Sequence, residues 1–561
     1  MKYADKIKAA LPLGAVLLGA AALRLWGIGF GLPHTEARPD ESTVIFISLR
    51  ALLWDPAPAS LVYPTAYTYL LSVVYAAYAL LAKLLGCGAG LAALLDEYAA
   101  SPENIYLINR WLVALSGVAT VLVVYKTAKL RAGARAGFLA ALFMAVCYLH
   151  VRDSHFGTLD VPMTLFVVWS VFYAAKWQDN PSGFNYVLAG LLAGLATGTK
   201  YVGILLAVHG VCAHLAAAPG RKIFRALCDK KLWLFEGALV LGFLVSTPHA
   251  FLSFGQLVAD FSYHKNLHGV MHGSNLWHHV SLSLNYGLGW PLLAAAFAGF
   301  MWCAVAQWRL FAALFPFTIL YFAAAEKVSS GYVRYAIPLL PFFCLSAALL
   351  CERALSCFPA VRQRVFAVVL AALLAALPLY SSIRLDALLS RPDSRNGALS
   401  AARTLIPDGA SIGVLCGIYG CPALPWDGEF YKTRAEQARA QGNEFKARLF
   451  EALDAAPALS GGPRYRMAAY DPDRDGFRLV SGQAVAPDWA LVEKSQLENL
   501  SALPQEMAKA LRGYEPAFSV EAMDLSCSGN RYDQEDAFYL PYSGFACVQA
   551  PGPNLYFLKK S

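Results

Sequence analysis

The 561-residue sequence has few charged side chains. Asp, Glu, Lys and Arg together make up 15% of the residues, whereas hydrophobic residues make up 57% and the mean hydropathy is +0.46. Soluble globular chains carry about 25% charged and roughly 45–50% apolar residues. The composition therefore excludes a disordered chain, a nucleic-acid-binding tail protein, a disulfide-rich miniprotein and an ordinary cytosolic enzyme.

The sequence also lacks a cleavable signal peptide and an internal repeat of fixed period. Residues 1–10 lead into an apolar segment without a small-residue cleavage site, so we interpret this end as a membrane anchor. The H-E-x-x-H pattern of zinc proteases is absent as well.

The positive charge is distributed unevenly. Residues 1–382 carry 27 Lys and Arg against 16 Asp and Glu, whereas residues 383–561 carry 19 against 22. The net charge of +8 thus belongs to the hydrophobic part, where basic residues report membrane topology. We predict a transmembrane domain over residues 1–382, followed by a soluble α/β domain over residues 383–561. This domain shows alternating segments such as 411–416 and 489–493, a polar helical stretch over about 431–453 and short strands over 538–561.

The apolar part predicts a polytopic helical bundle, because a spanning helix needs about 20 mostly apolar residues. Eleven segments fit: 9–30, 106–128, 137–151, 159–177, 183–199, 201–217, 232–250, 283–306, 309–325, 335–350 and 364–382. A further apolar stretch, 62–86, is placed on the outer surface, which puts 17 of the 27 basic residues inside. We therefore expect a multi-pass protein of the inner (plasma) membrane, with a cytoplasmic N-terminus and a periplasmic or other extracytoplasmic C-terminal domain.

Polar side chains gather at the predicted outer face, in segments 34–41, 150–160, 251–282 and 326–334 and at Lys200. Charges at the border of a bilayer are costly and indicate function. A single helix over 183–217 would be about 52 Å long, too long for a span, so the chain is expected to turn at Lys200. The pattern favours a cavity for an anionic, membrane-attached substrate, although Lys200 snorkelling to the interface is an alternative.

Several sequence blocks carry a family resemblance. They are Arg24-Leu-Trp-Gly27, Arg38-Pro-Asp-Glu41, Tyr63-Pro-Thr-Ala-Tyr67, Ser154-His-Phe-Gly-Thr-Leu-Asp160, Gly194-Leu-Ala-Thr-Gly-Thr-Lys200 and Arg334-Tyr-Ala-Ile-Pro-Leu-Leu-Pro341. Their ordered set, over about residues 20–380, resembles the GT-C glycosyltransferases, in particular the protein O-mannosyltransferase-like enzymes and the lipid A aminoarabinose transferases. The resemblance implies a mainly α multi-span bundle with helices lying on the outer surface.

The resemblance also implies a reaction. A sugar would be transferred, with inversion, from a polyprenyl-phosphate donor to a lipid A, glycan, lipid or protein acceptor at the outer face; nucleic acid is not an expected partner. Phosphate leaves as a stable anion, so the site needs a base for the acceptor and cations for the phosphate. Asp40 matches the Asp of the family's first loop and is the expected catalytic base, assisted by Glu41. Capping of a helix that starts near Ser42 is the alternative for Asp40.

The remaining site residues are expected to bind substrate. Lys200 and Arg334 are the candidates for the phosphate, with an interface anchor as the alternative for Arg334. The other candidates are Asp160, His155, His264, His268, Tyr335 and Tyr63. Asp160 precedes a predicted helix and has capping as its alternative. The spacing of His264 and His268 suits zinc but lacks partner ligands, so hydrogen bonding to phosphate or sugar, or a plain interfacial position, is preferred.

Cofactor, disulfides and an alternative function stay open at this point. No cofactor is required by the residues, and some GT-C members use a divalent cation, Mg²⁺ or Mn²⁺, for which Asp40 and Asp160 would be the ligands. Four cysteines of the tail, including Cys416 and Cys421, permit disulfides. The main alternative function is a flippase or transporter of lipid-linked sugars, which would be expected to show pseudo-repeats and mid-membrane polar groups.

Overall fold

The computed structural model describes residues 3–220, 222–267, 275–327, 331–456, 462–474, 476–497, 509–536 and 538–561. The chain divides into two compact units. Unit 1 comprises Met1–Trp26, Ala57–Leu70 and Arg110–Leu385, and unit 2 comprises Gly27–Pro56, Leu71–Asn109 and Asp386–Ser561. Unit 2 therefore joins segments of the first hundred residues to the C-terminal part, and the division at residue 382 stays a prediction.

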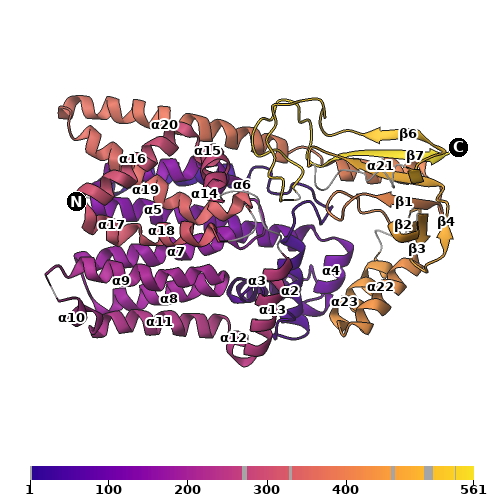
Figure 1. Cartoon of the computed structure of the whole chain (residues 1–561), viewed down its shortest axis with the longest axis horizontal. Helices are drawn as coiled ribbons and strands as arrows, with labels where there is room; N and C mark the ends of the chain where they lie inside the picture. Colours follow the sequence, from indigo (N-terminus) through magenta and orange to yellow (C-terminus); the bar gives the residue numbers. More distant parts are fainter. Residues whose placement is uncertain are drawn as a thin grey trace. The chain divides into compact units, whose positions relative to one another are not determined.

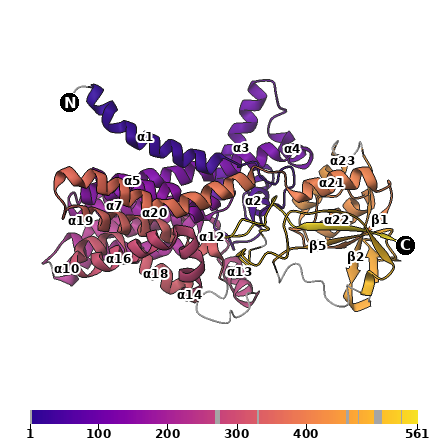
Figure 2. The ribbon, with the colours of Figure 1, turned by 90° about the horizontal axis from the view of Figure 1, so that it is seen from above.

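Unit 1 is helical. Its helices are α1 (Tyr3–Leu25), most of α5 (Glu103–Val146), α6 (Tyr148–Asp153), α7 (Asp160–Ala175), α8 (Gly183–Thr199), α9 (Leu205–Ala217), α10 (Ile223–Leu227), α11 (Lys230–Ser246), α12 (His249–Leu252), α13 (Phe254–Leu267), α14 (Asn275–His278), α15 (Asn285–Leu288), α16 (Trp290–Ala306), α17 (Trp308–Leu314), α18 (Pro316–Ala325), α19 (Leu340–Leu355) and most of α20 (Ala360–Leu389). Helices α16 and α19 lie side by side in Figure 1 and again in the perpendicular view of Figure 2.

Helices α8 and α11 pack closely because glycines remove side chains from the contact. A Cβ atom on Gly190 would lie 2.2 Å from the carbonyl oxygen of Phe235, and one on Gly194 would lie 2.4 Å from that of Leu239. Small residues at helix contacts are typical of membrane bundles, where backbones approach closely. This contact fixes the C-terminal end of α8, at which Lys200 follows.

The expected eleven spans are too many for the described residues. By length and composition alone, four helices there could cross a membrane, or up to six if each of two bent helix pairs is one span. Helices α7, α8, α9 and α11 contain 16, 17, 13 and 17 residues, which is short of the about 20 that a span needs. Helix α3 (Ala66–Leu84) is one of the four, so its expected position on the outer surface stays a prediction.

Two of the expected spans lie within one long helix. Residues 106–128 and 137–151 fall mostly in α5, which has 44 residues and is interrupted at Gly133 by a backbone with φ 87° and ψ 178°. Glycine adopts a positive φ without steric cost, so it allows the chain to bend there. Hydropathy alone finds the two apolar segments but not how they are joined.

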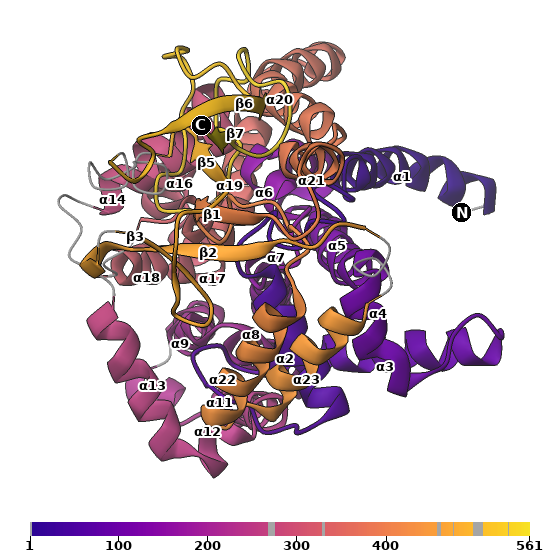
Figure 3. The ribbon, with the colours of Figure 1, turned by 90° about the vertical axis from the view of Figure 1, so that its right-hand side faces the viewer.

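Unit 2 combines short helices with a mixed sheet. Its elements are α2 (Glu41–Leu53), the larger part of α3, α4 (Leu94–Ala100), α21 (Ser394–Leu405), α22 (Gly428–Ala440), α23 (Glu444–Ala455), β1 (Ser411–Leu415), β2 (Arg466–Asp471), β3 (Gly476–Leu479), β4 (Ala484–Val485), β5 (Trp489–Lys494), β6 (Tyr514–Val520) and β7 (Asn554–Lys560). The strand order is β4-β3-β2-β1-β5-β7-β6, in which β1 runs parallel to β2 and β5 and the other pairs are antiparallel. Figure 3 shows α22 beside α23 near these strands.

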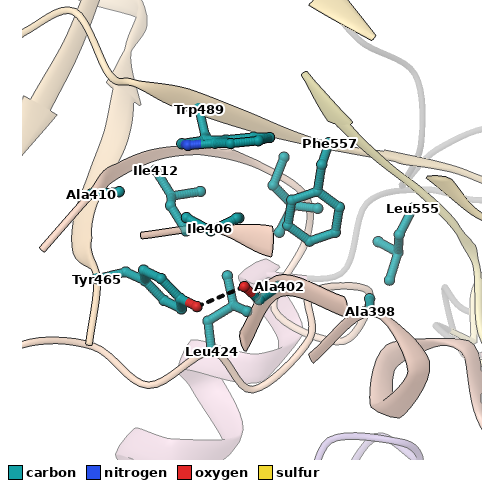
Figure 4. Packing of buried hydrophobic residues seen from close by; sticks show 11 residues of the cluster. Ala398, Ala402, Ile406, Ala410, Ile412, Leu424, Tyr465, Trp489, Leu555 and Phe557 are labelled. Atoms are coloured by element: carbon teal, nitrogen blue, oxygen red, sulfur yellow. Dashed lines mark hydrogen bonds between the residues drawn. The ribbon is translucent and has the colours of Figure 1, made fainter. Parts of the chain in front are cut away.

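One face of the sheet packs against α21. Ala398 and Ala402 of this helix meet Ile412 of β1 and Phe557 of β7 in a buried apolar cluster. The hydroxyl of Tyr465 donates a hydrogen bond to the carbonyl oxygen of Ala402 at 2.9 Å, as the dashed line in Figure 4 shows. Small residues on α21 let the helix lie close to the sheet. The helices and the mixed sheet of residues 394–560 confirm the α/β structure expected for the C-terminal part of the chain.

Details of this domain differ from the sequence expectation. The polar helical stretch expected over 431–453 forms two helices, α22 and α23, because Gly442 has a φ of 73° between them. The expected strands at 411–416 and 489–493 correspond to β1 and β5. Within the described residues from 538 to the end, β7 is the one strand, so the series of short strands expected there is wrong.

Candidate functional site

Lys200 lies at a break in unit 1. Helix α8 ends at Thr199, Lys200 has an extended backbone with φ −144° and ψ 131°, and a 3-10 turn begins at Tyr201. The Nζ atom of Lys200 donates to Oδ1 of Asp160 at 2.6 Å, with side chains 19% and 3% exposed. Nζ also lies 5.4 Å from the ring centroid of Tyr335. The chain thus turns at Lys200 as expected and holds its ammonium in a nearly buried ion pair.

Asp160 is the first residue of α7, but its carboxylate pairs with the ammonium of Lys200 and does not cap the helix. The N-cap of α7 is Leu159, and no side chain caps this end of the helix. Tyr335 and its neighbour Arg334 belong to the 3-10 helix η5 (Val333–Leu339), and the Cζ atom of half-buried Arg334 lies 4.7 Å from the ring centroid of Tyr332. Unit 1 therefore brings Asp160, Lys200 and Tyr335 together, with Arg334 next to Tyr335 in the chain.

Tyr63 is half-buried in the segment before α3. The hydroxyl of Tyr201 donates to the carbonyl oxygen of Leu61 at 2.8 Å, and the backbone N–H of Leu61 donates to Oδ2 of Asp260 at 2.6 Å. These bonds tie the segment of Tyr63 to the residue that follows Lys200. Asp260, from the His-rich segment, therefore fixes a neighbouring loop.

The three candidate histidines have different positions. His155 is fully buried, with Nδ1 2.9 Å from the carbonyl oxygen of Val151 and Nε2 3.0 Å from that of Trp26. Both ring nitrogens thus face backbone carbonyl groups of unit 1. His264 is in helix α13, with its side chain outside the described part of the structure, and His268 lies outside the described residues altogether.

Asp40 and Glu41 belong to unit 2, at the start of α2. Asp40 has a φ of 72°, and no other non-glycine residue in the described ranges has a positive φ. Its carbonyl oxygen accepts the first bond of the helix from the N–H of Val44 at 3.0 Å, whereas its side chain makes no capping hydrogen bond. Glu41 is fully buried. The absence of a capping hydrogen bond counts against capping as the role of the Asp40 side chain, and aspartate is one of the non-glycine residues that tolerate a positive φ.

Residues of the C-terminal segment hold the chain just before Asp40, and sequence reasoning missed them. Arg38 pairs with Asp536 at 2.5 Å, with both side chains almost fully buried. The guanidinium of Arg38 also lies 5.4 Å from the ring centroid of Phe538. Nδ2 of Asn396 donates to the carbonyl oxygen of Gly31 at 2.9 Å. The partners of Arg38 are about 500 residues away in the chain, so no local pattern could have indicated them.

The described residues offer no ready metal site. No group of three or more His, Cys, Asp or Glu side chains is close enough among them to hold an ion. The carboxylate of Asp160 already accepts the ammonium of Lys200, so a cation occupies the place next to it. Asp160 in this arrangement does not fit the role of a metal ligand.

Comparison with known proteins identifies the class of fold. The sequence model of the dolichyl-phosphate-mannose-protein mannosyltransferase family matches residues 106–251, about a quarter of the chain. No curated protein sequence matches the chain. The similar solved structures include GT-C glycosyltransferases, which confirms in fold the resemblance that the sequence motifs carry.

Among these structures are two of ArnT from Cupriavidus metallidurans. The one bound to undecaprenyl phosphate has a TM-score of 0.54 at 14% identity and covers 98% of this chain and 97% of that chain. The apo structure has a TM-score of 0.50 at 18% identity and covers 74% of this chain and 84% of that chain. The oligosaccharyltransferase AglB from Archaeoglobus fulgidus, in complex with an inhibitory peptide and a dolichol-phosphate, has 13% identity over 100% of this chain and 89% of that chain, with a TM-score of 0.49. The chain thus has an ArnT-like fold.

Proposed function

We propose that the chain is a membrane glycosyltransferase that moves a sugar from a polyprenyl-phosphate donor to an acceptor, with inversion at the transferred carbon. The observation that carries this proposal is the ammonium of Lys200, held nearly buried beside Asp160 and over Tyr335, with Arg334 next in the chain. A cation kept in this way suits an anionic headgroup at a membrane. The ArnT-like fold and the matched family model support the same class of reaction.

The proposed chemistry is a single displacement. The carboxylate of Asp40 takes the proton of the acceptor hydroxyl while the acceptor oxygen forms a bond to the anomeric carbon. The bond from that carbon to the phosphate oxygen breaks, and both of its electrons leave with the phosphate. Lys200 and Arg334 stabilise the negative charge that develops there, which is the main demand of a reaction with a phosphate leaving group. One displacement inverts the anomeric configuration.

Asp160 acts as a positioning residue in this proposal. Its carboxylate holds the ammonium of Lys200 at 2.6 Å and keeps it from extending into solvent. Tyr63, Tyr335, His155, His264 and His268 remain proposed substrate-binding residues, and Glu41 a proposed assistant to Asp40. His155 would then act through the backbone that it holds, because its ring nitrogens face carbonyl groups.

The location and partners follow from the same reasoning. We place the reaction at the outer face of the inner (plasma) membrane, with the N-terminus cytoplasmic and the C-terminal domain extracytoplasmic, because this orientation keeps the basic loops inside. The bilayer, the polyprenyl-phosphate sugar and a lipid, glycan or protein acceptor are the expected partners.

The test is a transfer assay with the purified full chain, labelled polyprenyl-phosphate sugars and membrane acceptors. We expect Asp40→Asn to abolish transfer, whereas Asp96→Asn, at an exposed carboxylate in the first turn of α4, should transfer normally. Unchanged transfer by Asp40→Asn would remove Asp40 as the base. Absence of transfer by the unmodified chain with every donor, together with donor movement across vesicle membranes, would contradict the transferase and favour a flippase.

A further inference from the structure

Unit 2 contains a cavity of about 600 Å³ that the proposed reaction does not use. It is lined by residues from 34–36, from strands β1 and β2, from the segment that follows β1, and from helices α22 and α23. Ligand-binding cavities of proteins typically measure about 300–1,000 Å³. None of the catalytic or substrate-binding candidates named above lines this cavity.

The walls of the cavity combine aromatic and apolar groups. Val414 of β1 and Met467 of β2 form part of the apolar lining. Both lie on the sheet face that carries Ile412, because Val414 is two residues further along the same strand and Met467 is the neighbour of Ile412 on β2. Phe430 is on α22, and its ring centroid lies 6.0 Å from that of Trp426. Both aromatic rings are half-buried, so each has a side that a ligand can cover.

The cavity also contains a buried side chain that lacks partners. His34 is 3% exposed, and within the described structure neither of its ring nitrogens has a hydrogen-bond partner. Burial, and then the positive charge of Arg395, hold the pKa of His34 well below its usual value. The ring is therefore neutral and offers one donor and one acceptor. Buried polar groups are nearly always hydrogen-bonded, so an unpartnered imidazole lining a cavity indicates a ligand.

Charged groups surround the same space. Arg434 follows Phe430 by one helical turn on α22, and its guanidinium lies 5.4 Å from the ring centroid of Phe430. Lys446 of α23 is exposed and lines the cavity as well. Glu36 accepts a hydrogen bond from Ser42 at 3.1 Å, and burial raises its pKa against the lowering effect of that bond. The cavity thus offers two cations and a carboxyl group whose charge is disfavoured by burial.

We propose that this cavity binds a saccharide that carries an anionic group, either a carboxylate or a phosphate. The apolar face of a sugar ring packs on Trp426 and Phe430, sugar hydroxyls donate to and accept from the neutral ring of His34, and the anionic group binds Arg434 and Lys446. A purely apolar ligand would leave the nitrogens of His34 without partners, and a free inorganic anion would leave the aromatic rings uncovered. Binding as such does not depend on transfer, whereas the identification of the saccharide as part of the acceptor rests on the proposed glycosyltransferase activity.

The binding test uses the full chain in detergent and saturation-transfer difference NMR, which detects weak ligands. The probes are glucose 6-phosphate, glucuronate, glucose and inorganic phosphate. We expect both anionic sugars to bind, and glucose and inorganic phosphate to bind at least about tenfold more weakly, because each lacks one of the two kinds of contact. Equal binding of glucose and the anionic sugars would overturn the role of the cations, and preference for inorganic phosphate would overturn the saccharide.

Three variants locate the binding. Arg434→Gln, at an exposed position, should weaken binding of both anionic sugars about tenfold without changing that of glucose. His34→Leu should weaken binding of all sugars while the melting temperature stays equal or rises, because the variant removes an unpartnered polar group. Lys432→Gln, at an exposed lysine on the same helix but outside the cavity lining, is the matched control and should bind normally.

The outcomes separate this proposal from the proposed function. If Arg434→Gln and His34→Leu both bind like the unmodified chain, the cavity is not the saccharide site and the proposal is wrong. If the unmodified chain binds the anionic sugars and the variants lose them, the proposal holds even when no transfer is observed. Transfer to an acceptor that carries an acidic sugar, if it is unchanged in His34→Leu and Arg434→Gln, contradicts only the acceptor role of the cavity.

Discussion

Replacing Lys200 by methionine tests the ion pair at the centre of the proposed donor site. The carboxylate of Asp160 is 3% exposed and its partner ammonium is 19% exposed, 2.6 Å away. Removing one member of a buried pair and leaving the other charged costs about 3–5 kcal/mol. Lys200→Met leaves the more buried charge, so we expect a loss of free energy of unfolding in this range.

The opposite replacement should cost less. Asp160→Asn leaves an ammonium that is about one-fifth exposed and has a flexible stem, with which it can reach water. We therefore expect a loss of about 1–3 kcal/mol, between the values for buried and surface pairs. The double variant carries no uncompensated charge and should be more stable than Lys200→Met.

The assay is denaturant unfolding of the purified chain in detergent, with Lys327→Met, at an exposed lysine of the same unit, as control. A parallel measurement of donor KM and kcat distinguishes binding from stability, because both single variants should raise the donor KM in the fraction that stays folded. The reasoning is refuted if Asp160→Asn destabilises the protein more than Lys200→Met. It is equally refuted if neither replacement changes stability by more than about 0.5 kcal/mol, the usual range of surface substitutions.

Two further predictions concern packing and pH. Gly194→Ala should destabilise the protein by about 1–3 kcal/mol through overpacking of α8 on α11, measured by unfolding, whereas Gly237→Ala, which meets nothing within 4 Å, should be neutral or stabilising. Burial keeps the pKa of His34 low in the folded protein, whereas the imidazole of the unfolded chain takes up a proton as the pH falls below about 6.5. The free energy of unfolding therefore decreases with falling pH by up to about 1.4 kcal/mol per pH unit. Unfolding free energies at pH 7, 6 and 5 should show this slope and its reduction in His34→Leu; an identical slope in the variant would contradict it.

The apolar pattern of the sequence predicted where unit 1 is helical, but not how many of its helices are long enough to span a membrane. The segment 183–217 is an example of a correct prediction: a single helix of this length would be too long for a span, and the structure has a turn at Lys200. Hydropathy does not report where a helix stops short of the about 20 residues of a span, as α9 does after 13 residues. Such ends depend on local backbone conformation and on neighbouring helices.

The sequence could not reveal contacts between distant segments. Arg38 and Asp536 are 498 positions apart in the sequence, and their burial follows only from the folding of the C-terminal segment onto the first loop within unit 2. The saccharide cavity is a similar case, because its residues come from positions 34–36 and from 414–467. His34 could be noticed as one polar residue in a polar segment, but its lack of partners is a property of the three-dimensional structure alone.

The backbone of Asp40 allows the loss of a base to be separated from the loss of a fold. Asparagine tolerates a positive φ about as well as aspartate, whereas a β-branched residue does so only with strain of about 1–2 kcal/mol. We therefore expect Asp40→Asn to abolish transfer with an unchanged free energy of unfolding, and Asp40→Val to abolish transfer and also reduce that free energy by about 1–2 kcal/mol. Unfolding measured beside the transfer assay checks both. If Asp40→Asn is as unstable as Asp40→Val, the carboxylate stabilises the loop, and its loss of activity is no evidence for a catalytic base.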